Sequence, residues 1–211
     1  MNRELIAKSL IGAITYIVSV VEIIYVWLQL FNGSGYYYDL GGELIMKSLG
    51  LASIGAGDLG QSLLLGPLAM SGYLPVFMAL LIMITNSLIA IYTYKLSRVR
   101  GGLGIGPVTA IVLASIINAS LINSITNPWL PQAISTALAI AMYYYIDNND
   151  RLVSTALSAL LAFLSPITDL LNVLVPITHW FVKREFNESS QYVMTIGLIA
   201  FTYYWIAGAT R

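Results

Sequence analysis

The chain has 211 residues, of which 58% are hydrophobic and only 9% are charged, whereas about a quarter of the residues in a soluble domain are charged. Ten acidic and ten basic side chains give a formal net charge of zero. This balance argues against a nucleic-acid partner, because a protein that binds nucleic acid needs a basic surface. The absence of cysteine excludes disulfides and thiolate chemistry, and one histidine excludes a histidine-cluster metal site, so we expect no metal and no cofactor. This composition predicts a protein that is covered largely by lipid.

Five segments are long and apolar enough to cross a bilayer, which takes about 20 predominantly apolar residues in a helix. These segments are residues 9–31, 74–95, 104–125, 130–147 and 190–208. The connections between them are short, and no extramembrane module is evident in the sequence. We therefore predict an all-α, polytopic integral membrane protein with six or seven transmembrane helices.

Two further segments are rich in helix breakers. Residues 43–70 contain many glycines and end near Pro67, and residues 151–182 are interrupted by Pro166 and Pro176. Each segment is longer than one straight span requires and too short to cross a bilayer comfortably twice. Both are predicted to be broken or re-entrant helices.

The basic residues predict the topology. The loop at residues 95–101 is the most basic in the chain, and Arg3 and Lys8 lie at the start of the first span. The positive-inside rule therefore places the N-terminus and this loop in the cytoplasm, in a multi-pass protein of the cell membrane. An even number of crossings then separates them, which favours a re-entrant 43–70. A full crossing of 43–70 remains the alternative, with the N-terminus outside.

Residues 1–211 are predicted to form a single transmembrane domain. Residues 1–100 and 101–211 each contain one long, breaker-rich segment with a central aspartate. Such an outline is typical of the weakly related halves of many transporters, in which inverted repeats build the substrate site.

Asp58 is the first candidate site residue, because it lies among apolar and small residues in the stretch IGAGDLGQSLLLG. A charged side chain at membrane depth costs about 2.5–3.5 kcal/mol on insertion scales, so such residues usually face a protein interior or a water-filled cavity. Gln61 follows three residues later and would share the same helix face. The alternative is that 43–70 lies at the membrane surface and Asp58 is hydrated there.

Asp169 is the second candidate. Pro166 removes one helical N–H, and Thr168, Asp169 and Asn172 then offer oxygen atoms within one turn. We predict a cation or proton site there. The alternative is that Asp169 caps a second helix that begins after the break at Pro166.

Glu22 is the third candidate, because apolar residues continue on both sides of it within the first span. It must be protonated or paired with a polar group on another helix, for which Asn86, Asn118, Asn123 and the two aspartates are available. The alternative is a neutral glutamate that joins two helices by a hydrogen bond. His179 is predicted to reach the membrane interface, with a proton-linked role as the alternative.

Residues 55–58 read Gly-Ala-Gly-Asp, and Tyr38 is followed by Asp39. This pattern resembles the Gly-x-Gly-Asp motif of the intramembrane aspartyl proteases, which include presenilins and signal peptide peptidases. The resemblance implies that Asp39 and Asp58 share one proton and activate water. The chain departs from that family because only 19 residues separate the two aspartates, Asp39 lies in a polar loop, and no Pro-Ala-Leu motif follows.

The leading prediction is a transporter or channel for a small solute or cation. Its pathway residues would be Asp58, Asp169, Glu22, Gln61, Asn172 and Thr168. One alternative is a non-catalytic subunit of a larger membrane complex, and a second is the aspartyl protease, the only one of the three that is an enzyme. The expected partners are the lipid bilayer, the transported solute, and other membrane subunits or further copies of this chain.

Overall fold

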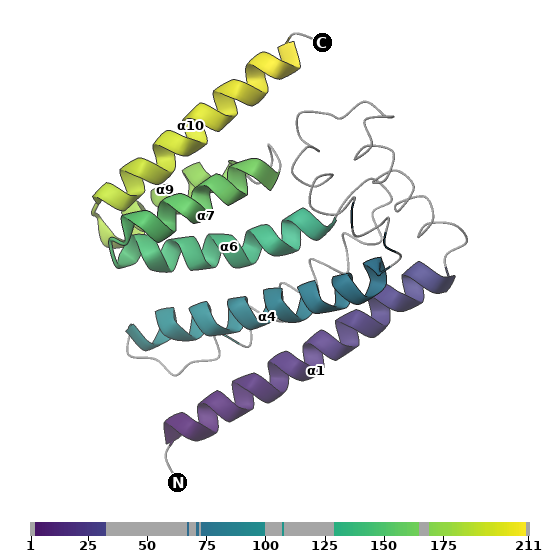
Figure 1. Ribbon diagram of the computed structural model, residues 1–211. Helices are drawn as coiled ribbons and strands as arrows, with labels where there is room; N and C mark the ends of the chain where they lie inside the picture. Colours follow the sequence, from purple (N-terminus) through teal and green to yellow (C-terminus); the bar gives the residue numbers. More distant parts are fainter. Residues whose placement is uncertain are drawn as a thin grey trace. The chain divides into compact units, whose positions relative to one another are not determined.

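In the computed structural model, the described part of the chain consists of helices and the short turns and loops that join some of them (Figure 1). The described residues are 3–32, 67, 71, 73–99, 107, 129–164 and 169–209. Several predictions concern residues outside these ranges and stay predictions. They concern almost all of the segments 43–70 and 104–125, and the residues Asp39, Asp58, Gln61, Asn118, Asn123 and Thr168.

The described residues form six helices and no strand, which confirms the all-α prediction. They are α1 (Arg3–Asn32), α4 (Leu74–Val99), α6 (Trp129–Asp147), α7 (Arg151–Leu164), α9 (Leu171–Lys183) and α10 (Glu188–Ala209). The predicted spans 9–31, 74–95, 130–147 and 190–208 each lie within one of these helices, because an uninterrupted apolar run favours one continuous helix.

Two of the described helices are long and apolar enough to cross a membrane. The stretches that qualify are Glu4–Tyr25 in α1 and Ala79–Arg98 in α4. They qualify by length and composition, which supports a membrane location weakly. A multi-pass arrangement therefore remains a prediction.

The chain divides into two compact units. The first comprises Met1–Leu40 and Gly72–Ala137, and the second comprises Gly41–Ser71 and Leu138–Arg211. The first unit contains α1 and α4. The second contains α7, α9, α10 and the part of α6 that follows Ala137.

In the first unit, α1 and α4 pack in an antiparallel pair. The carboxylate of Glu4 at the start of α1 lies 3.2 Å from the guanidinium of Arg98 at the end of α4. Farther along the pair, the side chain of Asn86 on α4 reaches Ser19 on α1. The Ser19 hydroxyl itself donates to the carbonyl oxygen of Thr15, so its hydrogen is used within α1. The face of α1 toward α4 therefore carries small polar side chains within an apolar helix.

In the second unit, the predicted broken segment 151–182 is a helical hairpin. Helix α7 ends at Leu164 and α9 begins at Leu171, whereas Pro176 lies inside α9 and ends no helix. Pro166 lies outside the described residues. The ammonium group of Lys183 at the end of α9 lies 2.8 Å from the carboxylate of Asp147, which precedes α7. The segment therefore starts and ends at the same place. At 1.5 Å per residue its arms are roughly 20 Å long, which is shorter than a hydrocarbon core of about 30 Å.

Helix α10 packs along both arms of this hairpin. The Tyr204 hydroxyl donates to the carbonyl oxygen of Ala162 on α7 at 2.5 Å. Gly197 lies against α9, where a Cβ atom on this glycine would come within 2.8 Å of the Asn172 Cβ. Only glycine permits this approach, so the contact of α10 with the first turn of α9 depends on Gly197.

Replacing Gly197 with alanine is expected to lower the free energy of unfolding by about 1–3 kcal/mol, because an added methyl group in a packed contact forces the helices apart. Gly12 on α1 is the matched control, since a Cβ atom there meets nothing within 4 Å. Gly12→Ala should be neutral or stabilising by up to about 1 kcal/mol through helix propensity. Unfolding of the purified variants checks both values. Equal effects at the two glycines would contradict the close approach.

Candidate functional site

Glu22 lies in a buried polar cluster between α1 and α4. Its side chain is 5% exposed, and Asn86 on α4 is fully buried. The amide nitrogen of Asn86 donates to the Glu22 carboxylate at 2.9 Å and to the Ser19 hydroxyl oxygen at 3.1 Å. Ser19 and Glu22 are three residues apart and so share one face of α1. The prediction that Glu22 pairs with a polar group on another helix, with Asn86 among the candidates, is confirmed.

The Asn86 side chain keeps one acceptor open. Both of its amide hydrogens are used by Glu22 and Ser19, while its carbonyl oxygen Oδ1 is buried and has no hydrogen-bond partner among the described residues. A buried carbonyl without a partner costs about 1–3 kcal/mol. An open acceptor therefore accompanies a buried carboxylate.

Asp169 lies in a second buried cluster, at the turn of the α7–α9 hairpin. Asp169 is 1% exposed and Asn172 is fully buried. The Asn172 amide nitrogen donates to the Asp169 carboxylate at 2.9 Å and to the carbonyl oxygen of Ser158 at 3.0 Å. Asp169 and Asn172 thus lie together as predicted. The alternative role of Asp169 as a helix cap is wrong. Leu170 occupies the N-cap position of α9, and no side-chain hydrogen bond caps this helix.

The two clusters have the same construction. In each, a buried carboxylate accepts one amide hydrogen from an asparagine, and the second amide hydrogen goes to another oxygen. The Oδ1 atoms of Asn86 and Asn172 are both buried and lack a partner among the described residues. One cluster belongs to each compact unit. Sequence reasoning missed Ser19 and Ser158, and only the position of Ser19, three residues before Glu22, carried a signal.

A third polar cluster closes the base of the hairpin. The Asp147 carboxylate lies 3.3 Å from His179 Nε2 and 2.8 Å from the Lys183 ammonium group. The His179 ring packs edge-on against the ring of Tyr143. His179 is only 2% exposed, so the prediction that its side chain extends outward into the membrane interface is wrong, while its depth in the membrane stays a prediction. The reason is Asp147, which lies 32 residues earlier and meets His179 only because the hairpin folds back.

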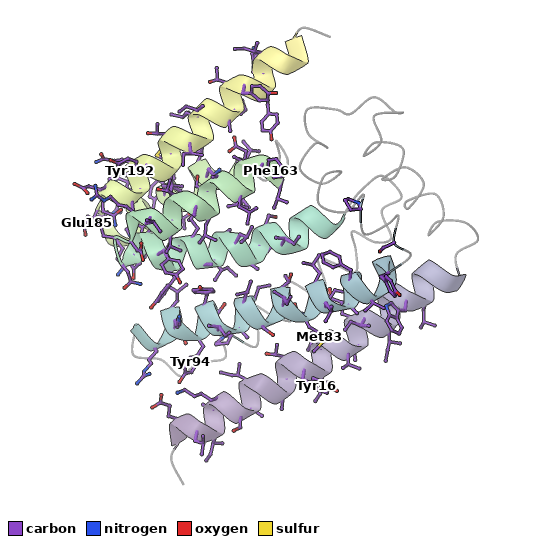
Figure 2. The ribbon with its side chains drawn as sticks, viewed as in Figure 1. Tyr16, Met83, Tyr94, Phe163, Glu185 and Tyr192 are labelled. Carbon is purple, nitrogen blue, oxygen red and sulfur yellow. The ribbon has the colours of Figure 1, made fainter. Side chains whose placement is uncertain are left out.

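The face between α1 and α4 also forms a groove of about 590 Å³. Most of its wall is apolar, and Lys8, Lys95 and Arg98 line one end of it. Figure 2 labels three wall residues, Tyr16 on α1 and Met83 and Tyr94 on α4. Ser19 belongs both to this wall and to the Glu22 cluster, so the groove ends beside the buried carboxylate.

The structure thus places three of the predicted site residues, Glu22, Asp169 and Asn172, in buried polar clusters, while Asp58, Gln61 and Thr168 lie outside the described residues. Comparison of the chain with models of protein families, with curated proteins and with solved structures finds no match.

Proposed function

We propose that this chain is a multi-pass membrane protein that carries a small solute or cation across the bilayer, with Glu22 and Asp169 as charged groups of the pathway. One observation carries the proposal: each carboxylate is buried beside an asparagine whose carbonyl oxygen has no partner among the described residues. Ionisable groups within membrane segments usually mark ion, proton or substrate paths. An unsatisfied buried acceptor requires an explanation such as a bound ion, a water or a ligand group.

The charge and the oxygen atoms suggest the kind of cargo. A cation that leaves water needs oxygen atoms that replace its hydration shell. The first cluster offers the Glu22 carboxylate, the open Asn86 carbonyl oxygen and the Ser19 hydroxyl oxygen. One carboxylate supplies a single negative charge, which balances a monovalent cation, a proton or an ammonium group on a solute.

The position of Glu22 along α1 is consistent with this role. Fourteen residues separate Lys8 from Glu22, which is roughly 21 Å along a helix. If Lys8 lies at the membrane surface, Glu22 then lies beyond the middle of a hydrocarbon core of about 30 Å. A carboxylate at that depth is costly unless it is used or paired.

The hairpin of α7 and α9 places Asp169 in a comparable way. Its base carries Asp147 and Lys183, which suit a membrane surface, and its turn carries Asp169 and Asn172. Because each arm is roughly 20 Å long, a hairpin with its base at the surface ends inside the bilayer. Re-entrant segments of this kind are tolerated where protein or a water-filled cavity surrounds their non-helical turn.

The proposal is tested by flux in liposomes that contain the purified chain, with proton, sodium, potassium and methylammonium gradients as probes. Glu22→Gln and Asp169→Asn remove the charge and keep an oxygen atom that accepts the asparagine hydrogen bond. Each is expected to reduce the flux at least about tenfold, or 1.4 kcal/mol of barrier, with little loss of stability. Glu185→Gln is the control, since Glu185 is an exposed acid outside the clusters (Figure 2).

Two outcomes would end the proposal. In one, both charge-neutral variants keep the flux of the unchanged chain. In the other, the unchanged chain moves none of the four probes. Either result would mean that the two carboxylates serve only to join helices by hydrogen bonds, which is the role expected in a non-catalytic subunit.

A further inference from the structure

The groove between α1 and α4 is apolar along most of its length and basic at one end. Ile11 and Ile91 are among its apolar wall residues. Lys8, Lys95 and Arg98 line the other end, on the first turns of α1 and the last turns of α4. A ligand that fits this groove carries a negative charge at one end and an apolar body.

The length of the groove matches one leaflet of a bilayer. Its wall on α1 extends from Lys8 to Ser19, which is 11 residues or roughly 16 Å of helix. Half of a hydrocarbon core of about 30 Å is nearly the same length. With Lys8 at the headgroup level, the groove runs from the membrane surface to its middle.

Two of the three cations that line the basic end lie against Glu4. Glu4 lies 3.0 Å from the Lys8 ammonium group and 3.2 Å from the Arg98 guanidinium. Lys95 lies 5.0 Å from the centre of the Tyr92 ring. Glu4 therefore competes with any anion for Lys8 and Arg98.

Two further observations indicate a ligand rather than a void. The Tyr94 hydroxyl is buried in the wall of the groove and has no hydrogen-bond partner among the described residues. Gly12 also lines the groove, and a Cβ atom there would meet nothing within 4 Å. The wall therefore offers one unused hydrogen-bonding group near the basic end and open space along the apolar part.

We propose that this groove binds one anionic phospholipid of the bilayer, with its phosphate at Lys8, Lys95 and Arg98 and one acyl chain along the apolar wall toward Ser19. Basic pockets between membrane helices on the cytoplasmic side bind anionic headgroups in this way. The Tyr94 hydroxyl then donates to an oxygen of the headgroup or glycerol region. The inference depends on the proposed membrane placement and not on transport, since Glu22 is not a residue of the groove wall.

The charge arm of the test uses the purified full-length chain in a neutral detergent, titrated with dioleoylphosphatidylglycerol or dioleoylphosphatidylcholine. Bound lipid is counted by native mass spectrometry. One phosphatidylglycerol is expected to bind at least about tenfold more tightly than phosphatidylcholine. Lys95→Gln/Arg98→Gln should weaken its binding by about 25-fold, at about fivefold per lost charge, and Glu4→Gln should strengthen it by about fivefold.

The matched control for this arm removes two exposed basic groups that do not line the groove. Arg151→Gln/Arg184→Gln is expected to leave the affinity for phosphatidylglycerol unchanged. An equal loss in both double variants would mean that net charge alone attracts the lipid, and the proposal would be wrong. Weaker binding in Glu4→Gln would overturn it as well, because a purely structural role of the ion pairs predicts that direction.

The shape arm of the test fills the groove. Gly12→Leu places a side chain into the open space, so it should reduce phosphatidylglycerol binding at least about tenfold while the basic end stays intact. Ala13→Leu adds the same side chain at an exposed neighbouring position outside the wall and should have no effect. Unchanged binding in Gly12→Leu would show that no acyl chain lies in the groove.

Inorganic phosphate separates the two sources of the anion. It should not displace phosphatidylglycerol at millimolar concentration, because the acyl chain contributes much of the affinity. Effective displacement would assign the basic end to a free anion and overturn the lipid proposal. Glu22→Gln should bind phosphatidylglycerol normally, so a failure of the transport proposal leaves this result unaffected.

Discussion

Replacing Asn172 with alanine is expected to lower the free energy of unfolding by about 3 kcal/mol, because the Asp169 carboxylate loses its amide donor while it remains buried. Asp169 is 1% exposed, and the Asn172 amide nitrogen is 2.9 Å from it. The same change removes the bond to the carbonyl oxygen of Ser158 on α7. Alanine keeps the Cβ atom that packs against Gly197, so the loss is confined to the polar contacts. Equilibrium unfolding in mixed detergent micelles measures it.

Two further variants test whether the loss comes from the contact between Asn172 and Asp169. Asn148→Ala removes an exposed asparagine whose side chain bonds to the carbonyl oxygen of Tyr144 in the preceding turn, and it should change stability by less than about 0.5 kcal/mol. Adding Asp169→Asn to Asn172→Ala should recover part of the loss, since no buried charge is then left without the amide donor. A loss of equal size at Asn148, or no recovery in the double variant, would show that the Asp169 cluster does not hold the hairpin turn.

Replacing Asn86 with leucine is expected to cost about 2–3 kcal/mol, because Glu22 loses the hydrogen bond that crosses from α4 to α1. Replacing both residues with leucine should cost little or even stabilise the pair of helices, because a buried polar pair often contributes no more than apolar packing of similar volume. The two changes are thus expected to be strongly non-additive. Unfolding of the two single variants and the double variant, under the conditions used for Asn172, gives the coupling energy.

The double leucine variant of Glu22 and Asn86 also tests the transport proposal. If the double leucine variant is stable but transports nothing, the pair is kept for the pathway and not for the fold. If the loss in the double variant equals the sum of the two single losses, Asn86 does not interact energetically with Glu22, and the hydrogen bond at 2.9 Å contributes nothing measurable. That outcome would also remove the main support for Glu22 as a charged group of the pathway.

The helices followed from the sequence because their cause is local. Long apolar runs without breakers predicted α1, α4, α6 and α10, and the structure extends the first of these runs to Arg3–Asn32. The separation of 151–182 into two helices, α7 and α9, was also predictable, since a proline inside a helix removes one hydrogen bond and clashes with the preceding turn. Pro176 shows the limit of this rule, because packing holds α9 together around it, where it is buried.

The partners of the buried polar groups were harder to predict. The position of Glu22 in an apolar run predicted that it needs a partner, but three asparagines on other helices were equally available in the sequence. Asn86 lies 64 residues away from Glu22, and only the antiparallel packing of α1 against α4 brings them together. His179 was misjudged for the same reason, because its partner Asp147 belongs to another helix.

By itself, the sequence determined that this chain is helical, that apolar surface dominates it, and that its few embedded acids require partners. These properties depend on residue type and short-range spacing, which a chain carries before it folds. The tertiary structure alone decided which asparagine meets which acid, that residues 151–182 fold back as a hairpin, and that a basic-ended groove lies between α1 and α4. Such features depend on contacts between segments far apart in the chain, and these exist only once the helices pack.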